Sequence, residues 1–118
     1  WWQMNSKKTA NLLTMCIKAG KAVKGFDSAC DSVKNGMAYC ILTASDASEK
    51  TVKETNFICE KYSVPLVKTE LSKDEMARIC GKVTAVIAIC DKGFANGFSK
   101  INTWNSYHNV IWTIILCD

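Results

Sequence analysis

The sequence has little of what marks a loop-rich, membrane-spanning or exported chain. Its 118 residues include one proline and six glycines, which argues against a loop-rich or repetitive architecture. The longest apolar run, residues 110–117, is interrupted by Thr113 and is far shorter than the ~18–20 residues that span a bilayer. The first residues have none of the regions of a signal peptide, so we expect no export and no membrane partner.

Metal-site and redox spacings are absent although seven cysteines are present. No C-x-x-C pair occurs, and the single histidine, His108, has no ligand cluster around it. Most of the cysteines lie inside apolar segments, such as Met-Cys-Ile at residues 15–17 and Tyr-Cys-Ile at residues 39–41. This pattern is typical of reduced, buried cysteine that acts as a small hydrophobic residue. We therefore expect a cytoplasmic protein with no metal or other cofactor.

A catalytic constellation is lacking as well. The sequence contains no nucleophile elbow, no phosphate-binding glycine loop and no metal triad, and the commonest general base occurs only in the C-terminal tail. Most acidic residues fall in the first turns of predicted helices, where capping and the helix dipole explain them. We therefore expect a protein that is not an enzyme.

What is present is the composition of one globular domain with a polarised charge. Apolar residues make up 48% and charged residues 22%, which argues against disorder. The net charge of +4 lies entirely in residues 1–45, because residues 46–118 hold nine basic and nine acidic residues. A basic patch points to nucleic acid or another polyanion, and a solvated lysine-rich face is the plain alternative.

Apolar periodicity predicts helices that alternate with short strands. We expect helices at about residues 5–19, 27–35, 46–62, 72–80 and 92–101, and strands at 22–24, 38–43, 66–68 and 84–90. The inner faces of the second and third helices are predicted to contain Phe26, Cys30, Val33 and Met37, and Val52, Thr55, Cys59 and Tyr62. This alternation predicts an α/β fold, a three-layer α-β-α sandwich around a small mixed sheet of about four strands.

Helix-start signals support three of these boundaries. Asn5 or Ser6 is placed to cap the first helix, and residues 46–49 (Asp-Ala-Ser-Glu) resemble a capping box for the third. Residues 72–75 (Ser-Lys-Asp-Glu) form a complete capping-box pattern for the fourth helix. Residues 1–3 and 102–118 do not fit the pattern. The aromatic and β-branched tail is an added strand, an interface segment or a segment introduced by a shift of reading frame.

The turn around Gly25 is the most informative stretch for function. A helix N-terminus offers unpaired N–H groups and a partial positive charge. Lys21 and Lys24 flank the turn, and Lys18 ends the preceding helix, so together they predict a cradle for a phosphate or a base edge. The alternative is an ordinary strand-to-helix turn with Asp27 as its N-cap.

Several short pieces, taken in order, resemble one family. They are Leu-Leu at 12–13 with Lys-Ala-Gly-Lys at 18–21, Gly25, and residues 34–38 with 41–42, 44–48, 64–66, 77–82 and 86–95. With these pieces, residues 4–101 resemble the kink-turn RNA-binding ribosomal proteins of the L7Ae/L30e family, above all its small bacterial members. We assign the domain to residues 4–101 on this ground.

The resemblance implies a non-catalytic protein that binds structured RNA in a ribosome or ribonucleoprotein. The family recognises sheared G·A pairs at a kinked internal loop with the glycine turn and the second helix, and packs a loop after the fourth helix on an extruded base. Carried over by position, the RNA-binding residues are Lys24, Gly25, Phe26, Asp27, Ser28 and Asp31, and then Lys82, Val83 and Thr84. We add Lys18, Lys21 and Lys34 from the basic surface.

The second-helix motif departs from the family pattern. Stronger RNA binders of the family have Asn, Glu and Lys where this chain has Asp27, Ser28 and Asp31. Guanine presents N7 and O6 acceptors, whereas an ionised aspartate can only accept, and a lost bidentate base contact costs ~1–3 kcal/mol. The departure predicts weaker or altered recognition, unless Asp31 pairs with Lys34 or Lys24 and is structural. The alternative function is a dimerising protein-interaction module of the same fold, which the acidic substitutions and the aromatic tail would suit.

Overall fold

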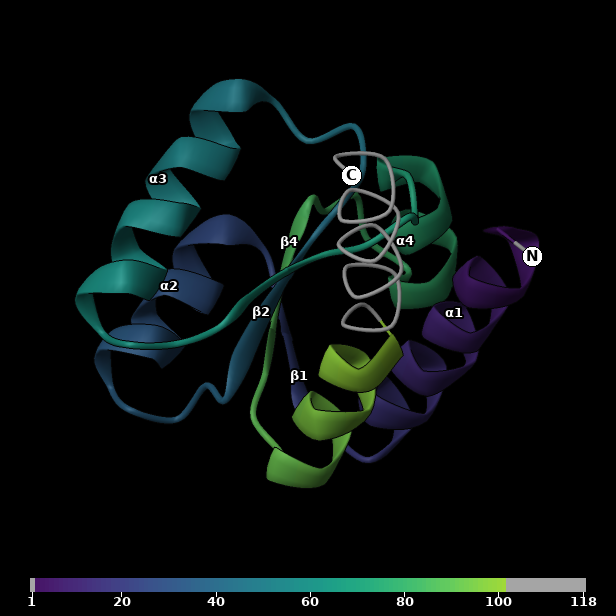
Figure 1. Cartoon of the computed structure of the whole chain (residues 1–118), viewed down its shortest axis with the longest axis horizontal. Coiled ribbons are helices and arrows are strands. Elements are labelled where there is room, and N and C mark those ends of the chain that lie inside the picture. Colours follow the sequence, from purple (N-terminus) through teal and green to yellow (C-terminus); the bar gives the residue numbers. More distant parts are fainter. Residues whose placement is uncertain (1, 102–118) are drawn as a thin grey trace, which may run out of the picture.

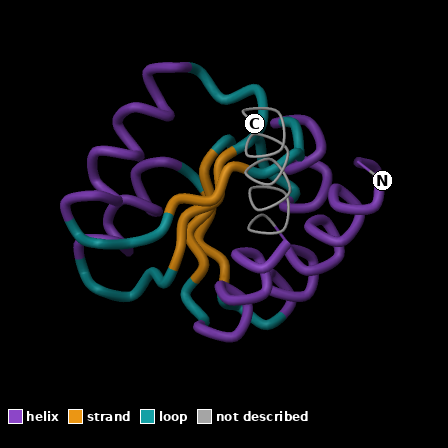
Figure 2. The backbone as a smooth tube through the Cα atoms, in the orientation of Figure 1, coloured by secondary structure: helices purple, strands orange, loops and turns teal. Residues whose placement is uncertain are grey.

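A four-stranded mixed sheet separates two layers of helices in the computed structural model, which describes residues 2–101 (Figures 1 and 2). The strand order is β1-β4-β2-β3, with β4 antiparallel to both of its neighbours and β2 parallel to β3. The strands are β1 (Ala22–Lys24), β2 (Cys40–Thr43), β3 (Leu66–Lys68) and β4 (Val86–Ile89). This confirms the predicted α/β sandwich with a small mixed sheet.

Helices cover both faces of the sheet. They are α1 (Trp2–Lys18), α2 (Phe26–Lys34), α3 (Glu49–Lys61), α4 (Lys73–Cys80) and a final helix at residues 92–101. Figure 1 shows α2 and α3 on one face, and α1, α4 and the final helix on the other. The interpretations offered for the tail concern residues 102–118, which lie outside the described residues.

The two central strands supply the core of both layers. Every residue of β2 and β4 is buried, as their continuous apolar sequences predict. Alternate side chains point to opposite faces, so Leu42 packs in the cluster of Leu13 and Phe98, while Ile41 packs in that of Val33. Full burial of a side chain of this size contributes ~1.5–3 kcal/mol. The sheet therefore positions α2 so that its first turn meets the end of β1 and the start of β4.

Helix boundaries match the sequence prediction at α4 and differ at α1 and α3. Ser72 and Glu75 form the predicted capping box. The predicted capping of α1 by Asn5 or Ser6 is wrong, because the helix already begins at Trp2. The predicted start of α3 at Asp46 is also wrong, because Ser48 is the N-cap. The Asp46 carboxylate instead accepts a hydrogen bond from the Lys73 backbone N–H at 2.8 Å, which ties the loop before α3 to the start of α4.

Two residues assigned to inner helix faces are exposed. Met37 is 59% exposed because α2 ends at Lys34, before the apolar period reaches it. Tyr62 is 40% exposed because it is the C-cap of α3, where the chain turns away from the helix axis. The remaining members of both faces are buried or partly buried, so the predicted orientation of α2 and α3 is confirmed.

Candidate nucleic-acid interface

The turn at Gly25 connects β1 directly to α2. Its N–H donates to Val86 O at 3.0 Å and to Thr84 Oγ1 at 3.1 Å, and its φ of +98° is one that residues with a Cβ rarely adopt. Gly25 is the N-cap of α2 and has no side chain, so the first N–H groups of the helix receive no side-chain cap. The alternative in which Asp27 is the N-cap is wrong, because Asp27 already lies in the first helical turn.

Lys24 ties this turn to the C-terminus of α4. Its Nζ donates to the Cys80 carbonyl oxygen at 2.8 Å, and Cys80 is the last residue of the helix. A cation at a helix C-terminus is stabilised by the helix dipole and by the unpaired carbonyls there. Gly81 follows as the C-cap of α4 with a φ of +74°, a left-handed conformation that glycine adopts readily. Lys24 therefore positions the loop that follows α4.

Residues 82–84 lie against the Gly25 turn. Thr84 is buried and its hydroxyl donates to Val86 O at 2.9 Å while accepting from the Gly25 N–H. The Nζ of Lys82 lies 3.9 Å from the position that a Cβ on Gly25 would occupy. Val83 projects into solvent with 78% of its surface exposed. The two segments that the family resemblance marks, at 24–31 and 82–84, therefore meet in one place.

Asp27, Ser28 and Asp31 are all exposed on α2. Burial raises the pKa of the Cys30 thiol, the Lys34 ammonium lowers it, and the carboxylates of Asp27 and Asp31 raise it further, so these charges surround one part of the helix. Within residues 2–101, neither aspartate forms an ion pair. The proposed pairing of Asp31 with Lys24 or Lys34 is therefore absent from the part of the chain that the structure describes, and both carboxylates face solvent.

The other predicted lysines lie elsewhere. Lys21 precedes β1 at the end opposite Gly25, where its carbonyl oxygen accepts from the Cys90 N–H at 2.8 Å. Four residues of extended chain span about 13 Å, which separates Lys21, and Lys18 before it, from the Gly25 turn. Lys34 lies at the C-terminal end of α2. The structure therefore brings Lys24 and Lys82 to the turn. Lys18 and Lys21 lie away from it, although the predicted cradle needs them there.

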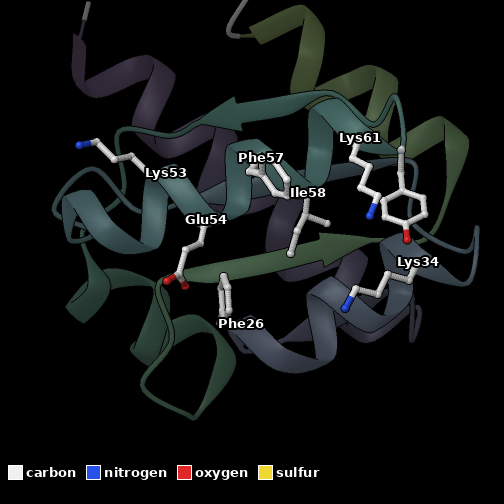
Figure 3. Close-up of a pocket in the computed structure, with 8 residues that line it drawn as sticks. Phe26, Lys34, Lys53, Glu54, Phe57, Ile58 and Lys61 are labelled. Atoms are coloured by element: carbon white, nitrogen blue, oxygen red, sulfur yellow. The ribbon is translucent and has the colours of Figure 1, made fainter.

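A groove between α2 and α3 was not predicted from the sequence. It has a volume of about 520 Å³ and is lined by Phe26, Lys34, Lys53, Glu54, Phe57, Ile58, Lys61 and Tyr62 (Figure 3). Phe57 is 67% exposed, and the Nζ of Lys61 lies 5.8 Å from the centre of the Tyr62 ring. An aromatic residue on the outer side of a predicted amphipathic helix, with lysines at Lys53 and Lys61, was the available signal. We call this feature the α2–α3 groove.

The groups at the Gly25 turn and in the α2–α3 groove can bind a ligand, and the buried thiols lie in the core. Burial raises the pKa of Cys40 to about 12 and those of Cys16 and Cys59 to about 11, so these thiols stay protonated at neutral pH. Among residues 2–101, no group of three or more His, Cys, Asp or Glu side chains is placed to hold a metal ion, and no helix has the length and apolar character needed to cross a membrane. Uncapped amides and ammonium groups beside them suit an anionic or acceptor-rich ligand.

Comparison with known proteins identifies close relatives. The chain is 37% identical over 86 residues to RNA-binding protein YlxQ of Bacillus subtilis, covering 72% of this chain and 85% of the relative. It is 33% identical over 91 residues to RNA-binding protein YlxQ of Enterococcus faecium, covering 77% and 87%. A 15.5kD RNA binding protein of Giardia lamblia has a similar structure, with a TM-score of 0.70, 25% identity, and coverage of 85% of this chain and 86% of that one. Residues 7–99 match the model of one family over most of the chain, so this protein belongs to the ribosomal protein L7Ae/L30e/S12e/Gadd45 family.

Proposed function

We propose that this protein is a non-catalytic binder of structured RNA of the kink-turn kind, associated with a ribosome or ribonucleoprotein in the bacterial cytoplasm. Its relatives in Bacillus subtilis and Enterococcus faecium are named RNA-binding proteins, as is its structural neighbour from Giardia lamblia. The observation that carries the proposal is the contact of residues 82–84 with the uncapped first turn of α2 at Gly25.

Each part of this surface has a role in RNA recognition. The free N–H groups at the start of α2 donate to the acceptor atoms of guanine or to phosphate oxygens. The Lys82 ammonium attracts the phosphate backbone, and the exposed Val83 side chain packs on a base that has left the helical stack. Lys24 contributes through position, because its ammonium already binds the Cys80 carbonyl oxygen. Recognition thus depends on backbone amides and on the loop after α4.

The exposed Asp27 and Asp31 set the strength of this interaction. Their carboxylates cannot donate to guanine N7 or O6 and they repel approaching phosphates. We therefore expect specific binding that is weaker than in family members with Asn and Lys at these two positions.

The test compares a kinked internal-loop RNA with a plain duplex of the same length at ~50 mM and ~200 mM salt. We expect the kinked RNA to bind about tenfold more tightly than the duplex or better, because the duplex lacks at least one good base contact that the kinked RNA makes. Lys82→Ala should weaken binding and reduce the salt slope by about 1. Lys68→Ala removes an exposed lysine from β3, at the opposite edge of the sheet, and is the matched control. Equal, weak affinity for both RNAs would contradict specific recognition.

A further inference from the structure

We propose that the α2–α3 groove binds about three unpaired nucleotides that continue from the RNA held at the Gly25 turn. The inference rests on the proposed function and adds a second contact surface to it. Lys34, predicted as an RNA-binding residue of the basic surface, lines this groove and lies at the far end of α2 from Gly25.

The composition of the groove matches the chemistry of single-stranded RNA. Aromatic rings come from both helices, Phe26 from α2 and Phe57 from α3, with Tyr62 at the end of α3. Bases stack on such rings with little dependence on sequence, and the phosphates between them need cations. Three lysines and one glutamate line the groove, so its charge is complementary to a polyanion.

The lining side chains are distributed along the length of the groove. Figure 3 shows Phe57 and Ile58 at the centre of the groove, Phe26 and Glu54 toward one end, and Lys34 and Lys61 toward the other. The Lys61 ammonium also lies over the Tyr62 ring at 5.8 Å, so cation and ring occur together at that end. Lys53 lies at the Glu54 end, so a strand that passes from Phe26 toward Lys34 meets both a ring and a cation at each end of the groove.

Continuity with the candidate RNA interface selects the occupant. Phe26 follows Gly25 directly, so the groove begins where the RNA surface of the Gly25 turn ends. Phe26 and Lys34 are eight residues apart on one helix, which is about 12 Å along its axis. At a stacked spacing of ~3.4 Å per nucleotide, this length takes about three nucleotides.

The experiment uses the full chain and two RNAs, the kinked internal-loop RNA and the same RNA with a single-stranded extension of ~6 nucleotides. With wild-type protein the extension should tighten binding about tenfold. Phe57→Ala and, separately, Lys61→Ala should remove most of this gain and leave the affinity for the unextended RNA unchanged. Phe57 and Lys61 are exposed, so unchanged binding of the unextended RNA also shows that each variant is folded.

Two control variants match these changes. Lys50→Ala removes an exposed lysine of α3 that does not line the groove, and Met15→Ala removes an exposed apolar side chain of α1 on the other face of the sheet. Both should keep the full gain from the extension.

Three results would overturn the inference. An extension without effect on wild-type affinity means that the groove takes another occupant, such as a protein segment. If groove and control variants lose the gain from the extension equally, the loss does not come from the groove. If a groove variant loses equal affinity for both RNAs, the groove does not bind the extension specifically. In each case, binding of the unextended RNA and its loss with Lys82→Ala report separately on the proposed function.

Discussion

Lys24 and Lys82 lie at the same turn, but their surroundings differ. The Lys24 ammonium is partly buried and hydrogen-bonded to Cys80 O, whereas Lys82 is exposed. A hydrogen bond from a charged group to a helix C-terminus stabilises the fold, whereas an exposed cation contributes little to stability. The two lysines should therefore be separable by experiment.

Lys24→Ala should lower the free energy of unfolding by ~1 kcal/mol and also weaken RNA binding, because the loop after α4 loses its tether. Lys82→Ala should weaken RNA binding with almost no change in stability. Urea denaturation and RNA titration of both variants measure the two effects. An equal loss of stability in both variants would show that the assignment of a structural role to Lys24 alone is wrong.

The double variant Asp27→Asn with Asp31→Lys should bind the kinked RNA about tenfold more tightly or better, because it restores a donor and removes repulsion. Its affinity should also depend more steeply on salt, since a new cation faces the phosphates. Asp74→Asn removes an exposed acidic charge from α4 and is the control. An unchanged affinity in the double variant would place the bound RNA away from this face of α2.

At the residue scale, the family resemblance predicted which positions lie together better than it predicted the contacts of each side chain. Gly25 and residues 82–84 were predicted as RNA-binding residues from the family resemblance, and the structure brings them together. The bond from Lys24 to Cys80 O joins residues 56 positions apart, and no local pattern encodes such a contact. The same holds for the α2–α3 groove, which exists only because two helices lie side by side.

Among the elements, α4 carries the strongest local signals and supports the loop at 82–84. Ser72→Ala should lower the free energy of unfolding by ~1 kcal/mol, because the Ser72 hydroxyl accepts from the Glu75 N–H and caps the helix. Chemical denaturation measures this loss. Ser45→Ala, in an exposed loop, is the control and should change stability by less than ~0.5 kcal/mol. A Ser72→Ala variant as stable as the control would show that the capping box contributes nothing.

Element boundaries were predictable where one signal dominated. Strands β1 and β3 lie where the sequence placed them, because glycine or proline and polar residues bound each short apolar run. The predicted start of α3 was wrong because Asp46 and Ser48 are both good N-caps. A distant partner decides between them, since the Lys73 N–H donates a hydrogen bond to the Asp46 carboxylate. Competition of this kind is settled by tertiary contacts.

For the whole molecule, alternation of helices and strands was enough to predict three layers. The strand order was not predictable in this way, because β1 pairs with β4, which lies about 60 residues away in the sequence. The distribution of cationic side chains depended on this order too. Antiparallel pairing of β1 with β4 places Lys21 beside Cys90, and it places the Lys24–Gly25 end of β1 beside Val86.

Buried thiols make the stability of the whole fold depend on pH in the alkaline range. Burial raises the pKa of Cys40 from 9.0 to about 12, and burial likewise raises that of Cys16 to about 11. Below pH 9 the folded protein and the unfolded chain both keep these protons, so the thiols do not lower the free energy of unfolding. Above pH 9 the unfolded chain releases protons that the folded protein retains, so stability falls as pH rises toward 11 to 12.

We expect the urea midpoint to fall between about pH 8 and about pH 10.5, and to fall less steeply in Cys40→Ala, which lacks one of these protons. All other groups are common to both proteins, so their contribution to the pH dependence cancels in the comparison. The same slope in both would mean that the Cys40 thiol does not contribute to the pH dependence.

The position of β4 determines when the candidate RNA surface can exist. This strand is the last of the four in the chain, yet it lies between β1 and β2 and supplies the Val86 carbonyl that holds the Gly25 N–H. A nascent chain that has emerged only as far as α4 has β1 without its hydrogen-bonded neighbour and a glycine turn without either acceptor. The candidate RNA surface therefore forms only late in synthesis, and truncated fragments that end before Thr84 should not bind RNA.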